Sequence, residues 1–533
     1  MRRTVVGLGL LLLTSLAPAA GPDRSPPVSS EVRSQANAYA NQMIAAFQHI
    51  QNNYFRKVSA SSLAEAAVTG LYEVAREPLP SGMKADLGRA QTLDDVRPLL
   101  VAARERLGDA EVVGGQNAIY VSIKSLTRVL DPYTGIPNRN DSRRAFQASP
   151  GVPGIGVELE GDVDAQVPYQ MEMGGFSGRA PARPAGPTGP VRIADVLPGG
   201  PAQLAGVRPG DVITHVDGRA LDAANGAQAV GRLSNPAADG GGKIQLQLRR
   251  PGKYEAIHLD LVPTLFRPET VFGVRRRTDN SWDHWLDAKA RIGYVRIGFI
   301  DSWTEPNTGA STAGTDAEAA SALANLMSAG MRGLVLDLRG CPGGFIIPAV
   351  KLIGLFVKEG PVATVKSANR PDQPDTKYAT SPLEETLVRG IPVIVLISAE
   401  TVGGGEMIAA ALQDNKVAEM AGQRTFGKGS VQQTNTVPNT NIPYKMTNGL
   451  IYRPNGKPLQ KMPNAKQGDA WGVTPDRGLE VPVTADLNKQ LKEWMRLQVL
   501  RPGGSREPLP LDDPENDPAR QFVLREMLKR VKN

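Results

Sequence analysis

The sequence has a single cysteine, Cys341, and only four histidines among 533 residues. One cysteine cannot form an internal disulfide, so the folded state depends on its hydrophobic cores. The histidines, His49, His215, His258 and His284, are scattered without the spacing of metal ligands. We therefore expect no metal site and no cofactor.

Dense runs of basic residues are also lacking. The chain has 61 Lys and Arg against 54 Asp and Glu, and aromatic residues make up only 5%. Because no Lys/Arg run is interleaved with aromatics, the sequence argues against nucleic-acid binding. Apolar residues reach 41%, which suffices for several cores in a chain long enough for three or four domains.

The longest apolar run stands at the start of the chain. Two arginines precede an apolar stretch from Val5 to Leu16, and small residues follow up to Ala20. This layout is typical of a secretory signal peptide and is too short for a permanent membrane span. We assign residues 1–20 to a signal peptide and expect an exported protein, periplasmic or secreted, with a buried N-terminal helix as the alternative.

The region that follows is predicted to be helical. Residues 21–30 form a Pro/Ser linker, and residues 31–147 form an N-terminal helical region. Apolar spacing within 31–76 predicts two helices in a hairpin. A polar segment at 77–115, which contains Gly and Pro, separates them from another helix near 118–130. We expect this region to pack the other domains together and to carry no chemistry.

A glycine-rich loop and a strand mark the next domain. Gly154-Ile155-Gly156-Val157 enters a strand, and VRIADVLPGGPAQLAGVRPGDVITHVDGRAL follows at 191–221. Together these stretches resemble a PDZ domain, which we place at 148–263, although the short glycine motif alone would also fit a plain hairpin. The Gly- and Pro-rich residues 162–190 are interpreted as a loop insertion in this domain.

The PDZ resemblance implies a groove for a peptide. Backbone amides of Gly154, Ile155, Gly156 and Val157 would hold a C-terminal carboxylate while the peptide adds as a strand to the sheet edge. A helix at 227–233 would line the groove. The expected partners are therefore protein or peptide C-termini.

Alternating strand and helix patterns begin near residue 290. Apolar strands at 290–300 and 333–338 flank a helix at 315–331, which predicts a βαβ unit with parallel strands. The stretch RGCPGG at 339–344 ends the second strand and opens another helix. The chain from 264 to 485 is thus predicted to be an α/β core.

The most informative stretch is 391–433. An apolar strand leads into the glycine turn 403–405, then into an amphipathic helix and an FGKG turn that carries Lys428. A strand that feeds a glycine turn at a helix N-terminus orients N–H donors toward an anion or a developing oxyanion.

The segments EMIAAALQD (406–414) and GQRTFGKGSVQ (422–432) resemble the core of the C-terminal processing (tail-specific) peptidases. These are serine proteases with a PDZ domain and a Ser/Lys dyad. The resemblance, which needs no gaps, implies Lys428 as general base, Gln432 as the residue that orients it, and the nucleophile at position 403. Position 403 is glycine, and the nearest upstream hydroxyl belongs to Thr401, two residues away.

The resemblance also implies an oxyanion hole made by the amides of Gly343 or Gly344 together with Gly404. For the fold it implies an α/β and α+β multidomain protein, with the helical region, the PDZ domain and an αβ peptidase core of ClpP/crotonase-like type. Residues 486–533 follow as a C-terminal extension, with a short helix expected at 521–531.

Two functions remain open from the sequence. The first is an exported C-terminal processing peptidase homologue that binds protein C-termini or unfolded tails through its PDZ domain. Serine-type hydrolysis would then need Thr401 or a water activated by Lys428, because the nucleophile serine is missing. The alternative is an inactive pseudoprotease that acts as a peptide-binding adaptor or scaffold, with an envelope adaptor as a further candidate partner. A polysaccharide-binding or structural envelope protein is a third, weaker candidate.

Overall fold

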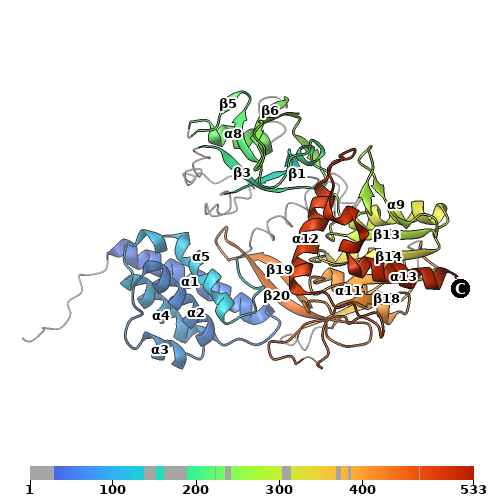
Figure 1. The fold of residues 1–533 in the computed structure, drawn as a ribbon. Helices are drawn as coiled ribbons and strands as arrows, with labels where there is room; N and C mark the ends of the chain where they lie inside the picture. Colours follow the sequence, from blue (N-terminus) through green and yellow to red (C-terminus); the bar gives the residue numbers. More distant parts are fainter. Residues whose placement is uncertain are drawn as a thin grey trace, which may run out of the picture.

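The computed structural model describes residues 29–136, 152–160, 189–222, 224–234, 242–302, 314–367, 374–381, 386–466 and 468–532. The expected signal peptide, nearly all of the linker and most of the loop insertion at 162–190 lie outside these residues. A helical region, a PDZ-type β domain and a larger α/β core follow one another along the chain (Figure 1). This arrangement confirms the predicted α/β and α+β multidomain class. Within the described residues, no helix has both the length and the apolar character needed to cross a membrane.

The helical region is built from helices throughout. Its elements are α1 (Ser30–Asn53), α2 (Ala60–Ala75), α3 (Met83–Arg89), α4 (Leu93–Arg106), η1 (Glu111–Val113), α5 (Gln116–Ser125) and η2 (Leu126–Arg128). The segment 77–115, interpreted as a polar separator, contains α3 and α4. Helix α4 begins at a capping box formed by Thr92 and Asp95, and it buries Val96 and Leu100.

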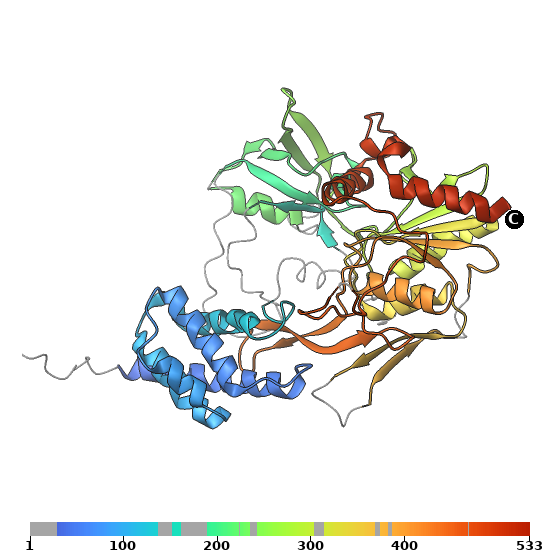
Figure 2. The same ribbon diagram turned by 60° about the horizontal axis from the view of Figure 1, so that its bottom comes forward.

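A long hairpin from the α/β core completes the helical region. Strands β19 (Ser430–Thr436) and β20 (Pro443–Tyr452) pair antiparallel and extend from the core to the helices (Figure 2). Buried hairpin side chains, among them Tyr444 and Met446, belong to the same hydrophobic cluster as the helices. The helical region and the core are therefore joined by a shared hydrophobic core.

The PDZ domain is an antiparallel sheet with two helices. The sheet has the order β2 (Val157–Leu159), β3 (Val191–Val196), β4 (Val212–Val216), β6 (Ile244–Arg249) and β7 (Ile257–Leu261), and β5 (Arg219–Ala220) pairs with β4. The helices are α7 (Pro201–Leu204) and α8 (Gly226–Ser234). Next to this sheet, β1 (Val152–Gly154) pairs with β8 (Thr264–Phe266). Because β2 stands at the edge of the described sheet, it can accept a further strand.

The α/β core is organised around one mostly parallel sheet. Its strands follow the order β12 (Trp285–Asp287), β13 (Ile292–Ile297), β14 (Gly333–Asp337), β17 (Val393–Ile397) and β18 (Glu419–Gly422), and β9 (Val271–Phe272) also pairs with β13. Strands β13, β14, β17 and β18 are parallel. Helix α9 (Thr315–Ser328) connects β13 to β14, so the predicted βαβ unit is present.

Helices cover both faces of this sheet. Helices α9, α10 (Ile346–Gly354) and α11 (Gly404–Asp414) share one hydrophobic cluster with side chains of one face, such as Leu334 and Val395. On the other face, α13 (Pro518–Lys532) packs against Val335 and Ile394. A second sheet, β16 (Thr376–Ala379), β15 (Pro361–Lys366), β20 and β19, lies beside the core, and β10 (Arg275–Arg276) pairs with β11 (Trp282–Asp283).

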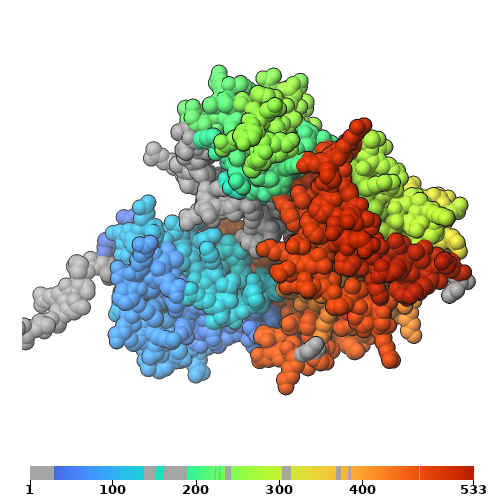
Figure 3. Space-filling model, in the orientation of Figure 1, coloured from blue at the N-terminus to red at the C-terminus, as the bar shows by residue number. Residues whose placement is uncertain are grey.

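The C-terminal residues are part of this packing. Helix α12 (Ala485–Leu500) ends with Leu500 inside the hydrophobic cluster of the PDZ domain, and Arg496 Nη2 contacts Asp195 Oδ1 at 2.7 Å. In the space-filling view, the red C-terminal segment lies against the green PDZ domain (Figure 3). Short helices η4 (Pro510–Asp512) and η5 (Pro514–Asn516) lead into α13. The segment expected to be an extension therefore covers the sheet and holds the PDZ domain.

Candidate active site

The turn between β17 and α11 places Gly403 directly before the first residue of the helix. Gly403 has φ 57° and ψ −115°, a left-handed conformation that side chains rarely adopt and that glycine tolerates. A Cβ atom at position 403 would meet nothing closer than Pro342 O, at 3.7 Å. Position 403, where the resemblance implies a nucleophile, therefore has room for a Cβ atom but carries no side chain.

Two glycine turns meet at this point. Gly343 approaches so closely that a Cβ atom on it would lie 2.6 Å from Gly404 N, and a Cβ atom on Gly404 would lie 3.5 Å from Gly344 N. Ile300 holds the turn that contains Gly343 and Gly344, because its N–H donates to Gly343 O and its carbonyl accepts from Phe345 N. The structure therefore brings together the three residues implied for the oxyanion hole.

The amides at this junction are not used in hydrogen bonds to the neighbouring turns that the structure describes. Among the described residues, none accepts a hydrogen bond from the N–H groups of Gly343, Gly344 or Gly404. The first N–H groups of a helix have no partner within the helix, and they carry its partial positive charge. The arrangement is suited to hold a carbonyl oxygen or a carboxylate.

Glu406 ties the glycine turn to the lysine turn. Its carboxylate is fully buried and accepts four hydrogen bonds: from Gly403 N (3.0 Å) and Lys428 N (2.8 Å) on Oε2, and from Gly427 N (2.7 Å) and Thr425 Oγ1 (2.6 Å) on Oε1. Burial raises the pKa of Glu406, and the four hydrogen bonds act in the opposite direction.

The sequence analysis did not single out Glu406, although it stands three residues after Gly403, the N-cap of α11, and an acidic side chain at that position can reach back to the cap. Because Gly403 N and Lys428 N share one carboxylate oxygen, the two backbone positions lie within two hydrogen-bond lengths of each other. Glu406 thereby fixes the distance between the empty nucleophile position and the turn of the expected base.

The variant Glu406→Gln is expected to lower the free energy of unfolding by about 3 kcal/mol. The amide has a single acceptor oxygen, so its NH₂ group faces two of the former donors, and at least one buried backbone N–H loses its partner. An unsatisfied buried donor costs about 1–3 kcal/mol, and a hydrogen bond to a charged group is worth about as much. Urea unfolding measures the difference.

Glu400→Gln is the matched control for this prediction. The Glu400 side chain is 40% exposed and contacts Lys492 at 3.3 Å. A surface ion pair of this kind contributes less than about 1 kcal/mol. Equal losses in the two variants would contradict the role assigned to Glu406.

Lys428 and Gln432 lie together as the resemblance implies. Lys428 Nζ donates to Gln432 Oε1 at 2.9 Å, and the ammonium group lies 4.9 Å from the centre of the Tyr133 ring. Gln432 Nε2 donates to Ser430 Oγ at 2.8 Å. The lysine therefore has an acceptor and an aromatic ring beside it.

Thr401 lies in the turn between β17 and α11, and its hydroxyl points toward the end of the neighbouring strand β14. Its side chain is fully buried, its hydroxyl donates to Leu338 O at 2.8 Å, and the same oxygen accepts from Ser398 N at 3.0 Å. Both functions of the hydroxyl are thus used in holding the turn to the neighbouring strand.

Asp301 is a buried carboxyl group beside the site that the sequence analysis did not single out. It follows Ile300, which holds the Gly343 turn. Its Oδ1 accepts from Ser302 N at 2.7 Å, whereas Oδ2 has no hydrogen-bond partner among the described residues. Burial, and to a smaller extent the charge of Glu318, raises the pKa of Asp301 to about 7 against the hydrogen bond from Ser302. The charge next to this turn therefore changes near neutral pH.

The four residues predicted to hold a peptide carboxylate lie at the end of β1, in the turn that follows it and at the start of β2. Gly154 packs against the C-terminal end of α8, and Ile155 N donates to Leu233 O at 2.9 Å. Gly156, with φ 80°, leads into β2, and its carbonyl accepts from Leu197 N at 2.9 Å. One of the four predicted amides is therefore engaged by α8, and the loop that carries them stands at the start of the edge strand.

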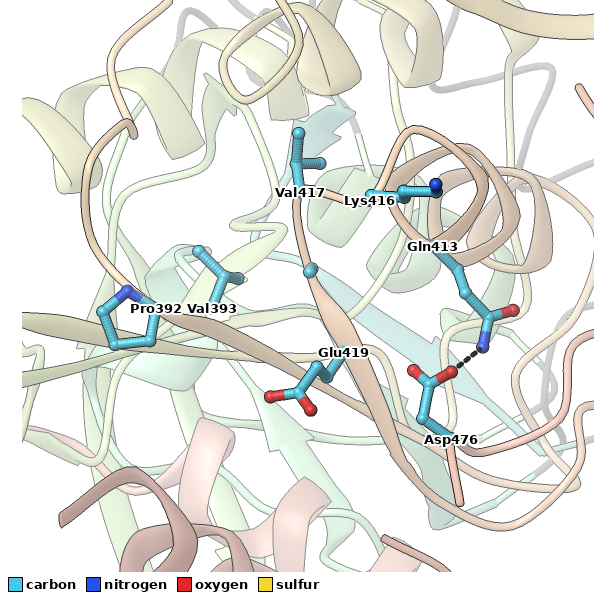
Figure 4. Close-up of a pocket in the computed structure, with 8 residues that line it drawn as sticks. Pro392, Val393, Gln413, Lys416, Val417, Glu419 and Asp476 are labelled. Atoms are coloured by element: carbon cyan, nitrogen blue, oxygen red, sulfur yellow. Dashed lines mark hydrogen bonds between the residues drawn. The ribbon is translucent and has the colours of Figure 1, made fainter. Parts of the chain in front are cut away.

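A hollow of about 410 Å³ lies at the other end of α11 (Figure 4). It is lined by Pro392, Val393, Gln413, Lys416, Val417, Ala418, Glu419 and Asp476. Gln413 Nε2 donates to Asp476 Oδ1 at 3.0 Å, and Asp476 Oδ2 accepts from Met420 N at 2.7 Å. Because an 11-residue helix is about 16 Å long, this hollow is separate from the Gly403 turn.

Two sequence profiles match the chain at these domains. The profile of the PDZ domain matches residues 192–239, and that of Peptidase family S41 matches residues 291–478. The chain therefore contains a PDZ domain and a peptidase domain of family S41. Its S41 domain contains the Gly343–Gly344 turn, the Gly403 turn and Lys428, so these parts of the candidate site lie within the matched residues.

Curated relatives of the chain include carboxy-terminal processing proteases. The carboxy-terminal-processing protease of Bartonella bacilliformis is 27% identical over 281 residues, which cover 51% of this chain and 55% of the relative. The chloroplastic C-terminal processing peptidase of Tetradesmus obliquus is 29% identical over 319 residues, or 59% and 60% of the two chains. The chain thus matches less than two thirds of the length of either relative.

Among solved structures, the chain aligns with a photosystem II D1 C-terminal processing protease. It aligns with 88% of this chain and 98% of its own at 22% identity, with a TM-score of 0.39.

Proposed function

We propose that this S41 homologue binds protein C-termini or unfolded tails and holds them without cutting through an acyl-enzyme. The observation that carries the proposal is Gly403, because the nucleophile position has no side chain. A serine protease that loses its nucleophile loses most of its covalent catalysis and keeps what its binding groups and oxyanion donors supply. Thr401 does not replace the serine in this proposal, because its hydroxyl is committed to Leu338 O.

The binding parts of the site support this function. The amides of Gly343, Gly344 and Gly404 have no acceptor among the described residues, and they need no side chain at position 403. Their role as donors to a carbonyl or carboxylate oxygen of the tail is part of the proposal. The PDZ groove would supply the first contact with the tail, as the edge strand β2 can pair with an extended peptide.

Hydrolysis by a displaced nucleophile is the second candidate function. It is favoured by the pair of Lys428 Nζ and Gln432 Oε1 at 2.9 Å, which remains in place although position 403 is glycine. A water molecule activated by Lys428 would then attack the carbonyl that the glycine amides hold.

We also propose that the chain is exported. The support is the pattern of residues 1–20, in which a basic start, an apolar stretch and small residues follow one another. A tail-binding protein outside the cytoplasm would meet exported chains, and an envelope adaptor remains a candidate partner.

The binding step is tested with a fluorescently labelled, unstructured peptide that ends in apolar residues. Fluorescence anisotropy is expected to show at least about 10-fold tighter binding of the peptide with a free C-terminus than of its amidated form, because hydrogen bonds to a carboxylate are worth about 1.5–3 kcal/mol. Mass spectrometry is expected to recover the peptide intact. Equal affinity for both forms would remove the carboxylate groove from the proposal.

A variant in the predicted peptide groove tests the same binding step independently. Gly156→Val is expected to weaken binding at least about 10-fold, because Gly156 has a positive φ and a Cβ atom there would lie 2.6 Å from Phe266 Cζ. Gly242→Val is the control, as a Cβ atom at Gly242 meets nothing within 4 Å. Unchanged affinity of a folded Gly156→Val protein would show that tails bind elsewhere.

A further inference from the structure

The turn that ends the helical region lies against the hairpin that carries Gln432. Gly135 and Lys445 of β20 exchange two backbone hydrogen bonds of 2.8 Å, and Thr447 N donates to Thr134 Oγ1 at 3.0 Å. The sequence analysis expected the helical region to carry no chemistry. These contacts bring one of its turns to the strands beside Lys428.

A continuous chain of hydrogen bonds runs from Lys428 to this turn. Lys428 Nζ donates to Gln432 Oε1 at 2.9 Å, Gln432 Nε2 donates to Thr447 Oγ1 at 3.2 Å, and Thr447 Oγ1 donates to Asp131 Oδ1 at 3.0 Å. Four side chains from the core and from the helical region are thereby linked. This series of hydrogen bonds ends at the Asp131 carboxylate, which accepts from Thr447.

The carboxylate sets the direction of every bond in the chain. Because an ionised Asp131 can only accept, the single hydroxyl proton of Thr447 points toward it. Thr447 Oγ1 can then only accept from Gln432, which turns the NH₂ group of the amide toward Thr447 and its oxygen toward Lys428. The orientation of a glutamine amide is decided by such a network, and bonds in a chain polarise one another.

Tyr133 gives the same turn a second contact with the lysine. Its backbone N–H donates to Asp131 Oδ1 at 2.8 Å, and its ring lies 4.9 Å from Lys428 Nζ. Burial, followed by the negative charges of Asp131 and Glu406, raises the pKa of Tyr133, so the phenol stays neutral. The face of a neutral aromatic ring attracts an ammonium group.

We infer that Asp131, Thr447 and Tyr133 are positioning residues for Lys428. Asp131 and Thr447 orient the Gln432 amide, and Tyr133 places a ring beside the ammonium group. The helical region then contributes two residues, Asp131 and Tyr133, to the positioning of Lys428. This inference goes beyond the proposed function, since it concerns how Lys428 is held whether a tail is cut, bound or absent.

The test follows the acylation of the Lys428 amine against pH in the full chain without a tail, with acetic anhydride as the probe and peptide mass spectrometry as the readout. Thr447→Val removes the hydroxyl, so the Gln432 amide keeps only its contact with Ser430, is held less firmly, and presents Gln432 Oε1 less often to the ammonium form of Lys428. The pH profile of Lys428 acylation is expected to move to lower pH, with about 5-fold faster acylation at neutral pH. Thr447→Ser restores the hydroxyl and is expected to return the profile to that of the unaltered chain.

Thr434→Val is the control on the neighbouring strand, where the threonine is exposed. It is expected to leave the Lys428 profile unchanged. If Thr447→Val, verified as folded by circular dichroism, keeps the profile of the unaltered chain, the inference is overturned. A shift that Thr447→Ser does not reverse would also overturn it, because a merely structural loss is then responsible.

Variants of Tyr133 keep the inference falsifiable if Thr447→Val does not fold. Tyr133→Leu removes the ring and is expected to shift the profile in the same direction by about 2–5-fold, whereas Tyr133→Phe keeps the ring and is expected to leave it unchanged. Identical profiles for the leucine and phenylalanine variants would show that the ring does not act on Lys428. Because no tail is present, none of these outcomes depends on the proposed function.

Discussion

The variant Asp517→Ala is expected to lower the free energy of unfolding by about 3–5 kcal/mol, which is the cost of breaking a buried ion pair. Asp517 accepts two hydrogen bonds from the Arg339 guanidinium, at 2.7 and 2.8 Å, and Arg339 also contacts Asp337. Asp337 and Asp517 are fully buried, and Arg339 is 7% exposed. Without Asp517, the guanidinium keeps one partner in a site that water does not reach.

The pH dependence of this loss follows from the pKa of Asp517. Burial raises that pKa, but the charge and hydrogen bonds of Arg339 outweigh burial and lower it to about 2. The stabilisation is therefore present above the pKa of an unfolded aspartate, about 3.9, and is lost as the pH falls toward 2. Urea unfolding between neutral pH and pH 2 is expected to show that the difference in free energy of unfolding between the unaltered chain and Asp517→Ala becomes smaller as the pH falls.

Asp486→Ala is the control for Asp517→Ala. Asp486 is exposed in the first turn of α12, where an acidic side chain contributes less than about 1 kcal/mol. If Asp517→Ala were no more destabilising than Asp486→Ala, the C-terminal helix would not hold the strand that leads to the Gly343 turn.

The variant Gly403→Ser is expected to create peptidase turnover at least about 100-fold above that of the unaltered chain. The new Cβ atom meets no atom closer than Pro342 O at 3.7 Å, and Lys428, Gln432 and the glycine amides are already present. In a serine protease the nucleophile contributes about 10⁶ to kcat. The gain is expected to be smaller here, because a side chain at φ 57° costs about 1–3 kcal/mol.

Gly403→Ala separates the hydroxyl from the strain. It adds the same Cβ atom in the same conformation, so its loss of stability is expected to equal that of Gly403→Ser, while its turnover stays at the level of the unaltered chain. Urea unfolding measures the stability, and casein degradation followed by gel electrophoresis measures the turnover. A folded serine variant with no more turnover than the alanine variant would mean that the site no longer has the geometry of a peptidase.

The elements around the site were predicted because their signals are local. The apolar runs at β13, β14 and β17, the helical spacing of α9 and α11 and the glycine turns are read from consecutive residues, and each has a simple physical meaning. Parallel pairing of β13 and β14 follows from the helix between them. For this reason the α/β core was predicted from its residues, whereas the PDZ domain and the peptidase family were predicted from the resemblance of longer motifs.

The missed features depend on contacts between distant residues. Helix α4 lies in a stretch with many charged residues. Its buried apolar residues, Val96 and Leu100, are too few to give a clear helical pattern in the sequence. The hydrogen bond between Thr447 and Asp131 joins residues 316 positions apart, and Arg339 and Asp517 are 178 apart. No local pattern records such pairs. Glu406 was the exception, since its place in the first turn of α11 was a local signal that the analysis did not use.

The central claim is that the unaltered chain holds tails without cutting them. The most direct test is the degradation of casein by the chain without residues 1–20, measured beside Lys428→Ala. The account predicts that neither protein releases peptides and that the unaltered chain retains a labelled tail peptide intact. Turnover by the unaltered chain that disappears in Lys428→Ala would contradict the account and would show a working peptidase with a displaced nucleophile.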